Sequence, residues 1–153
     1  MNGSLISTLT NEGTVSSTTS HGLYNDVGAT ITAFTNTGSI TGASSSFYDI
    51  YNDGTITTFN NDQGFSSSDP INYYGSLPSN YNIIINSTTD YGQVEFEGVS
   101  RDMNFGIHSS STLESATYTA VFNGISYSSQ LNDTTSGTVT NNGKVYSWSL
   151  ENV

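Results

Sequence analysis

Residues 50–61 read IYNDGTITTFNN and repeat most of the stretch LYNDVGATITAFTN at residues 23–36. The two copies share Tyr, Asn, Asp, Gly, Thr, Ile, Thr, Phe and Asn in one order and differ mainly by two additional residues near Gly28. The repeat also extends upstream, since Leu9, Phe34 and Phe59 follow one another at 25-residue intervals. Internal repeats of this length are typical of solenoids, propellers and arrays.

A shorter unit inside each repeat indicates β-strands. It consists of an apolar residue, then Asn and Gly, then Thr or Ser followed by Ile or Val, and it spans residues 9–15, 34–40, 50–56 and, with an insertion, 23–31. No stretch has the three-and-four spacing of apolar residues that an amphipathic helix needs. Ile and Val flanked by Thr favour half-buried strands with the aliphatic side chain turned inward.

Three asparagines recur with the same period, at Asn11, Asn36 and Asn61. In a parallel solenoid they would stack at ~4.8 Å, the distance between neighbouring strands, with their amides bonded along the stack. The sequence therefore predicts an all-β protein whose residues 1–64 form a short parallel β-solenoid (β-helix) of about two to three coils.

The second half lacks the repeat and predicts a separate C-terminal β-rich capping domain, residues 65–153. Apolar and polar residues alternate around Val94 and Val145, as in a sheet with one buried face. A small sandwich-like sheet over the last coil is the expected arrangement. Strands are expected near residues 71–76, 81–86, 93–97, 104–108, 117–122, 138–141 and 145–150.

Charge excludes several kinds of partner. The 153 residues contain 13 acidic side chains and two basic ones, for a net charge of −11. Because nucleic-acid binding depends on Lys and Arg that neutralise phosphates, we expect no nucleic-acid partner and no anionic membrane partner. The longest apolar run, Ile83-Ile84-Ile85, is far below the ~20 residues of a membrane span, so no membrane insertion is expected.

Part of the sequence resembles a known family. The Asn-x-Gly-Thr-Ile repeats, followed by YYGSLPSNYNIIIN at residues 73–86 and YGQ at 91–93, resemble the passenger regions of bacterial autotransporter-like surface proteins. YTAVFNG at 118–124 and YSWSL at 146–150 are similar to the segments that follow there. The resemblance implies an extracellular or cell-surface β-solenoid with a C-terminal β cap, and it implies no catalytic residues.

The chain departs from a complete autotransporter in two respects. The first residues, Met1-Asn2-Gly3-Ser4, are not a basic segment followed by an apolar stretch, as a signal peptide would require. No membrane barrel of alternating strands follows. Two interpretations remain: a fragment of a longer passenger, or a free-standing subunit that uses the fold to build something larger.

The first coil is the candidate site of assembly. It begins without a charged or helical segment that could cover its open strand edge, and such edges pair readily with other chains. We expect a self-assembly edge that adds a second copy head-to-tail, or that continues into upstream coils of a longer chain; alternatively, the first residues fold over as a small cap. The candidate edge residues are Leu5, Ile6, Leu9, Asn11 and Val15.

Catalysis and cofactors have little support in the sequence. The repeats contain no Lys or Arg, and no nucleophile motif accompanies the many Ser and Thr residues. Glu95 and Glu97 are expected to be solvated strand residues rather than a catalytic pair. Calcium would find oxygen ligands in the turns at Asp26 and Asp53, but no calcium-binding motif is present, so no cofactor is predicted.

These observations predict a non-enzymatic extracellular structural or adhesive surface protein that can assemble into filaments. The alternative is a carbohydrate-binding or carbohydrate-degrading module with surface glycans as partners. In that case Tyr73, Tyr74 and Tyr127 would stack against sugar rings, although burial in a core is the ordinary role of such side chains.

Overall fold

The computed structural model describes residues 3–44, 46–64, 69–132 and 135–151. Within these ranges the chain consists of short β-strands and one four-residue helix, α1 (Tyr127–Gln130). Most of the strands belong to two five-stranded sheets, and every strand pair in these two sheets is parallel. The prediction of an all-β parallel solenoid is therefore confirmed.

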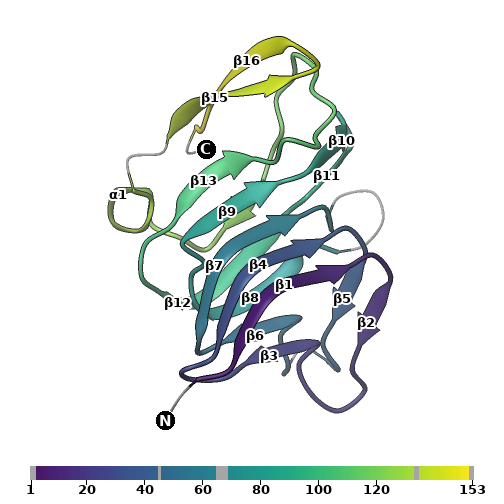
Figure 1. Cartoon of the computed structure of the whole chain (residues 1–153), viewed down its shortest axis with the longest axis vertical. Coiled ribbons are helices and arrows are strands. Elements are labelled where there is room, and N and C mark those ends of the chain that lie inside the picture. Colours follow the sequence, from purple (N-terminus) through teal and green to yellow (C-terminus); the bar gives the residue numbers. More distant parts are fainter. Residues whose placement is uncertain (1–2, 45, 65–68, 133–134, 152–153) are drawn as a thin grey trace.

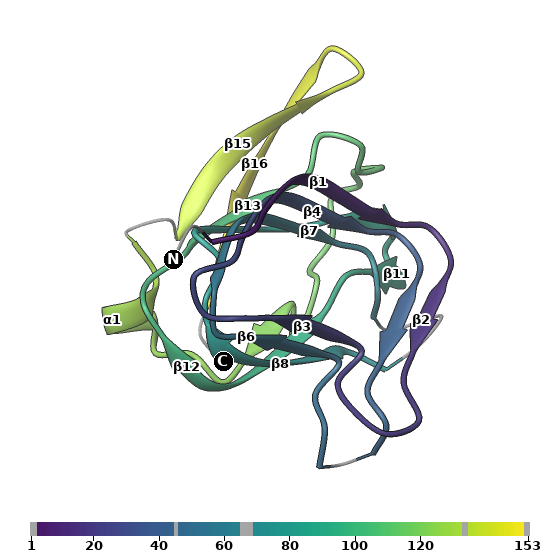
Figure 2. The ribbon, with the colours of Figure 1, turned by 60° about the horizontal axis from the view of Figure 1, so that its bottom comes forward.

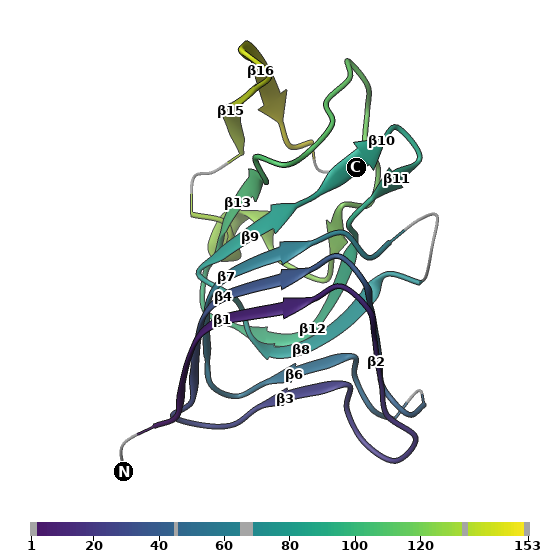
Figure 3. The ribbon, with the colours of Figure 1, turned by 45° about the vertical axis from the view of Figure 1, so that its right-hand side comes forward.

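The two large sheets form opposite walls of the coil (Figure 2). The first wall contains, in spatial order, β1 (Leu5–Asn11), β4 (Thr30–Asn36), β7 (Thr55–Asn61), β9 (Asn80–Ile83) and β13 (Asn104–Ile107). The second wall contains β3 (Leu23–Asn25), β6 (Ile50–Asn52), β8 (Ile71–Ser76), β12 (Val94–Ser100) and β14 (Phe122–Asn123). A short side sheet joins β2 (Thr14–Ser16) to β5 (Ser39–Thr41). Figure 3 shows the successive rungs stacked on one another.

Stacked rungs place equivalent residues of the repeat in columns. Leu9 pairs with Phe34, and Phe34 pairs with Phe59, in the 25-residue register that the sequence predicts. The column continues to Tyr81 and Phe105. The rings of Phe34 and Phe59 stack with their centroids 5.0 Å apart, so this aromatic column fills the interior between the two walls.

The predicted asparagine ladder is present. The Asn11 amide donates to Asn36 Oδ1 at 2.8 Å, and the Asn36 amide donates to Asn61 Oδ1 at 3.1 Å. A second ladder runs along the other wall from Asn25 to Asn52, with a donor-to-acceptor distance of 2.7 Å. Each amide therefore satisfies a buried polar group of the next rung, which lets polar side chains occupy the interior.

The solenoid is longer than predicted. The first wall contains five parallel strands rather than two or three, and pairing continues from β7 to β9 across the expected boundary between residues 64 and 65. The sequence repeat ends because different side chains occupy the equivalent positions of the later rungs. For example, Asn61 pairs with Ile83, which pairs with Ile107. The rung-to-rung spacing also changes, from 25 residues to 22 between Phe59 and Tyr81.

The C-terminal segment departs from the parallel pattern. β15 (Ser136–Asn141) and β16 (Lys144–Ser149) form an antiparallel hairpin, which lies at the end of the solenoid opposite β1 (Figure 1). Asn142 and Gly143 both have positive φ, 48° and 74°, as a tight two-residue hairpin turn requires. A further antiparallel pair joins β10 (Ile85–Ser87) to β11 (Asp90–Tyr91). The cap is thus a hairpin and loops, and the strand expected over residues 117–122 is reduced to β14.

Candidate functional site

The end of the solenoid formed by the first coil is open. β1, β2 and β3 each pair with a strand on one side only, and within the described part of the chain no strand covers their outer edges. Unpaired N–H and C=O groups along an edge strand are a template for adding another strand. In the described residues these three strands therefore form an unpaired edge of the solenoid.

The interior of the solenoid is exposed at this end. Ile6 and Val15 pair with Ile31 and Ile40, which are buried at 2% and 1% exposure. On the first rung, however, Ile6 is 44% exposed and Val15 is 37% exposed. Their exposure follows from the absence of a rung above them, because the same positions are buried one coil later. An apolar cross-section in contact with water favours association.

The remaining predicted edge residues differ in their surroundings. Leu9 faces the interior and is half-buried at the top of the aromatic column. Leu5 is 66% exposed, in register with Thr30, which occupies the same position in the second coil. Asn11 begins the ladder, and among the described residues its Oδ1 accepts the backbone N–H of Gly13, at 3.2 Å, and no second donor. In the third coil Asn61 Oδ1 accepts both a backbone N–H and an amide from the rung above. The ladder thus has an open acceptor position at this end.

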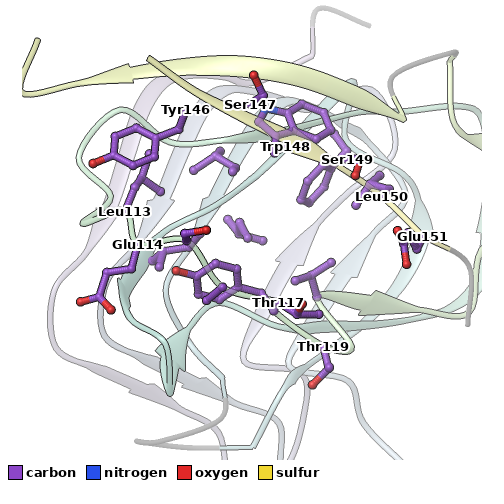
Figure 4. Close-up of a pocket in the computed structure, with 18 of the residues that line it drawn as sticks. Leu113, Glu114, Thr117, Thr119, Tyr146, Ser147, Trp148, Ser149, Leu150 and Glu151 are labelled. Carbon is purple, nitrogen blue, oxygen red and sulfur yellow. The ribbon is translucent and has the colours of Figure 1, made fainter. Parts of the chain in front are cut away.

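A cavity lies at the other end, between the last rungs and the β15–β16 hairpin. Its volume is about 820 Å³, and the solenoid contributes apolar walls from Ile83, Phe105 and Ile107. From the hairpin, Trp148 packs edge-to-face on Phe105 with 5.3 Å between ring centroids (Figure 4). Sequence reasoning missed this cavity, because its walls come from segments that are unrelated in sequence.

The predicted stacking tyrosines are not brought together. Tyr73 is fully buried in the core, where its hydroxyl donates to the Ser76 carbonyl at 2.6 Å and accepts from the Asn52 amide at 2.8 Å. Tyr74 faces outward from the same strand. Tyr127 begins α1, and its side chain lies outside the described residues. No shared surface of Tyr73 and Tyr74 is available to a sugar ring.

Tyr74 instead belongs to an outer aromatic stack that sequence reasoning missed. Tyr24, Tyr51 and Tyr74 pair in register, and their ring centroids are 5.3 and 5.1 Å apart. His21 joins the stack with its ring 4.7 Å from that of Tyr51. Because the rings face one another along the solenoid, they support the second wall, and Tyr24, the terminal ring, is 53% exposed. The equivalent positions of Tyr24 and Tyr51 in the repeat were the available signal.

Gly98 is required beside this stack. Its φ is 55°, and a Cβ at this position would lie 2.3 Å from the Tyr74 ring. Only glycine combines that conformation with so close an approach. The stack is thus part of the packing of β8 against the following coil.

The two glutamates of β12 and the two histidines lie in different parts of the chain. Glu95 and Glu97 are exposed on β12, as expected for solvated strand residues. His21 accepts the backbone N–H of Tyr48 at 3.0 Å, whereas His108 contacts Ser110. Among the residues that the structure describes, no group of three or more His, Cys, Asp or Glu side chains is placed to hold a metal ion. In the same part of the chain, no helix is long and apolar enough to cross a membrane.

Burial raises the pKa of two core tyrosines. The pKa of Tyr73 and that of Tyr81 are both raised by loss of hydration, more than the nearby Asn52 and Asn61 amides lower them. Because both tyrosines hold their protons more tightly in the folded chain than in the unfolded chain, they do not change the free energy of unfolding below their ordinary pKa of 10.0. Above that pH the unfolded chain ionises first, and the free energy of unfolding falls.

We therefore expect the free energy of unfolding, measured with urea, to fall steadily as the pH increases above 10.0. In the Tyr81→Phe variant the fall should be shallower, since one such group is removed. In an alkaline titration followed by phenolate absorbance, part of the absorbance increase should appear only at the pH at which the chain unfolds. Complete ionisation of all tyrosines while the fold persists would contradict this expectation.

Comparison with protein-family models, with curated proteins and with solved structures finds no match to this chain. The predicted relation to autotransporter passengers and the extracellular location remain predictions.

Proposed function

We propose that the chain is a non-enzymatic structural element of the cell surface or extracellular space, and that it works by adding further β-structure to its open first coil. The observation that carries this proposal is the exposure of Ile6 and Val15 at positions that are buried in the next coil. Backbone groups along β1 and an apolar cross-section are sufficient for strand addition, so no catalytic chemistry is needed.

Charge favours association through an end rather than through a side. The chain has a net charge of −11, and five of the six exposed large apolar residues of its described part lie at the first coil, beside unpaired strand edges. Sides that carry like charges repel one another, and an apolar end does not. Glycan binding has less support, because Tyr73 is buried and the rings of Tyr51 and Tyr74 face each other.

The test compares the wild-type chain with Ile6→Asp by negative-stain electron microscopy and sedimentation over a concentration series. We expect assemblies of the wild type and their loss in the variant, because a buried unpaired carboxylate at the contact is costly. Thr32→Asp adds the same charge to an exposed position of β4 and should still assemble. A wild-type chain that remains monomeric at every concentration would overturn self-assembly.

A further inference from the structure

Exposed apolar side chains are concentrated at the two ends of the molecule. Six large hydrophobic residues are exposed in the described part of the chain. Five of them lie on the first coil or in the turn that follows it: Leu5, Ile6, Val15, Tyr24 and Val27. The sixth, Val145, is 68% exposed and lies on β16, among the residues that line the C-terminal cavity. The middle coils carry none.

The two ends also share one cross-section. The column that starts at Leu9 ends at Phe105, and the column that starts at Asn11 ends at Ile107. Phe105 and Ile107 both line the cavity. A second molecule that approaches in the same orientation would therefore bring Leu9 and Asn11 above the columns to which they already belong.

We propose that the cavity beneath the β15–β16 hairpin accepts the first coil of a second copy of this chain. This inference rests on the proposed function and adds the site on the partner molecule. The cavity, about 820 Å³, has room for several aliphatic side chains, and its walls combine the last rungs with Trp148 and Leu113. Burying Leu9 there, with Ile6 beside it on β1, removes apolar area from water at both ends.

The geometry makes the contact heterologous. The first coil of one copy meets the hairpin end of the next, so the two surfaces are different and the contact does not close on itself. Each copy keeps one unused end after the first contact forms. The expected product is an unbranched filament whose length increases with protein concentration.

The charges near the contact are mostly acidic, and they include the exposed Asp26 of the first coil. Glu12 is the one charged residue of β1, β2 and the turn between them, and Lys144, one of only two basic residues, begins β16 at the accepting end. Glu114 and Glu151 also line the cavity. In Figure 4 the Glu114 side chain extends away from Trp148 and Leu150, which leaves the apolar walls of the cavity accessible.

The test uses variants that block one end each. Ile6→Asp blocks the donor end, and Ala116→Asp places a carboxylate in the lining of the cavity at an exposed position. Thr112→Asp is the matched control, because Thr112 is exposed in the same segment but does not line the cavity. Circular dichroism and thermal unfolding establish that each variant is folded.

Each blocked variant alone should remain monomeric, and Thr112→Asp should form filaments. An equimolar mixture of the two blocked variants retains one intact donor end and one intact acceptor end, so sedimentation should give a single species of twice the monomer mass. Filaments formed by Ala116→Asp would overturn the cavity as acceptor and leave the open first coil as the site of assembly. Monomers in the mixture would also overturn it, since an intact first coil and an intact cavity would then be present together without binding each other.

Discussion

Replacing Phe59 by Ala should lower the free energy of unfolding by about 3–5 kcal/mol. Phe59 is completely buried at the centre of the aromatic column, with its ring 5.0 Å from that of Phe34 and 5.7 Å from that of Tyr81. Truncation leaves a cavity that the stacked rungs cannot close, because backbone pairing on both sides holds β4, β7 and β9 at the spacing of a sheet. Urea unfolding followed by circular dichroism measures the loss.

Leu9→Ala is the matched control for this prediction. Leu9 occupies the same column on the first rung but is half-buried and has a rung on one side only. Its truncation should cost less than half as much, measured at a concentration where both variants are monomeric. Equal costs at the two positions would show that the column is not the main stabilising element.

Asn36→Ala should lower the free energy of unfolding by about 2–3 kcal/mol. Asn36 is completely buried, accepts from the Asn11 amide and donates to Asn61 Oδ1. The alanine variant leaves polar atoms of the neighbouring rungs without these bonds inside the solenoid, where water does not replace them. The loss is expected to exceed that from an ordinary exposed Asn by several-fold, and chemical denaturation measures it.

Asn11 provides the comparison for the ladder. It has the same residue type in the same column, but it is half-buried and only its amide is bonded to another rung. We expect Asn11→Ala to cost about 1 kcal/mol or less. If Asn36→Ala were as mild as Asn11→Ala, the ladder would contribute little to stability and would serve only to keep the rungs in register.

The open end was predictable in part. Ile6, Leu9 and Val15 recur at positions where later coils carry Ile or Phe, so the repeat already assigns them to the interior. The repeat also shows that they belong to the first coil. Leu5 was included as an apolar neighbour, yet it lies in register with Thr30 and not with a core residue.

The accepting end was not predictable from the sequence. Trp148 reaches Phe105 across 43 positions of the chain, and Leu113 comes from a segment without regular structure. A contact of this kind has no period and no motif. The burial of Tyr73 and the exposure of Tyr74 likewise depend on which face of β8 turns toward the core.

The repeat alone predicts the parallel coil, the 25-residue register of Leu9, Phe34 and Phe59, and the ladder through Asn36. Equivalent positions of stacked rungs meet their own counterparts, so selection for a matching neighbour appears as a repeat. Two features appear only in the folded chain: the coils continue past residue 64, and a cavity lies between the last rungs and a hairpin. The physical reason is that parallel pairing uses backbone N–H and C=O groups, so Ile83 and Ile107 can continue the column of Asn61 without repeating its side chain.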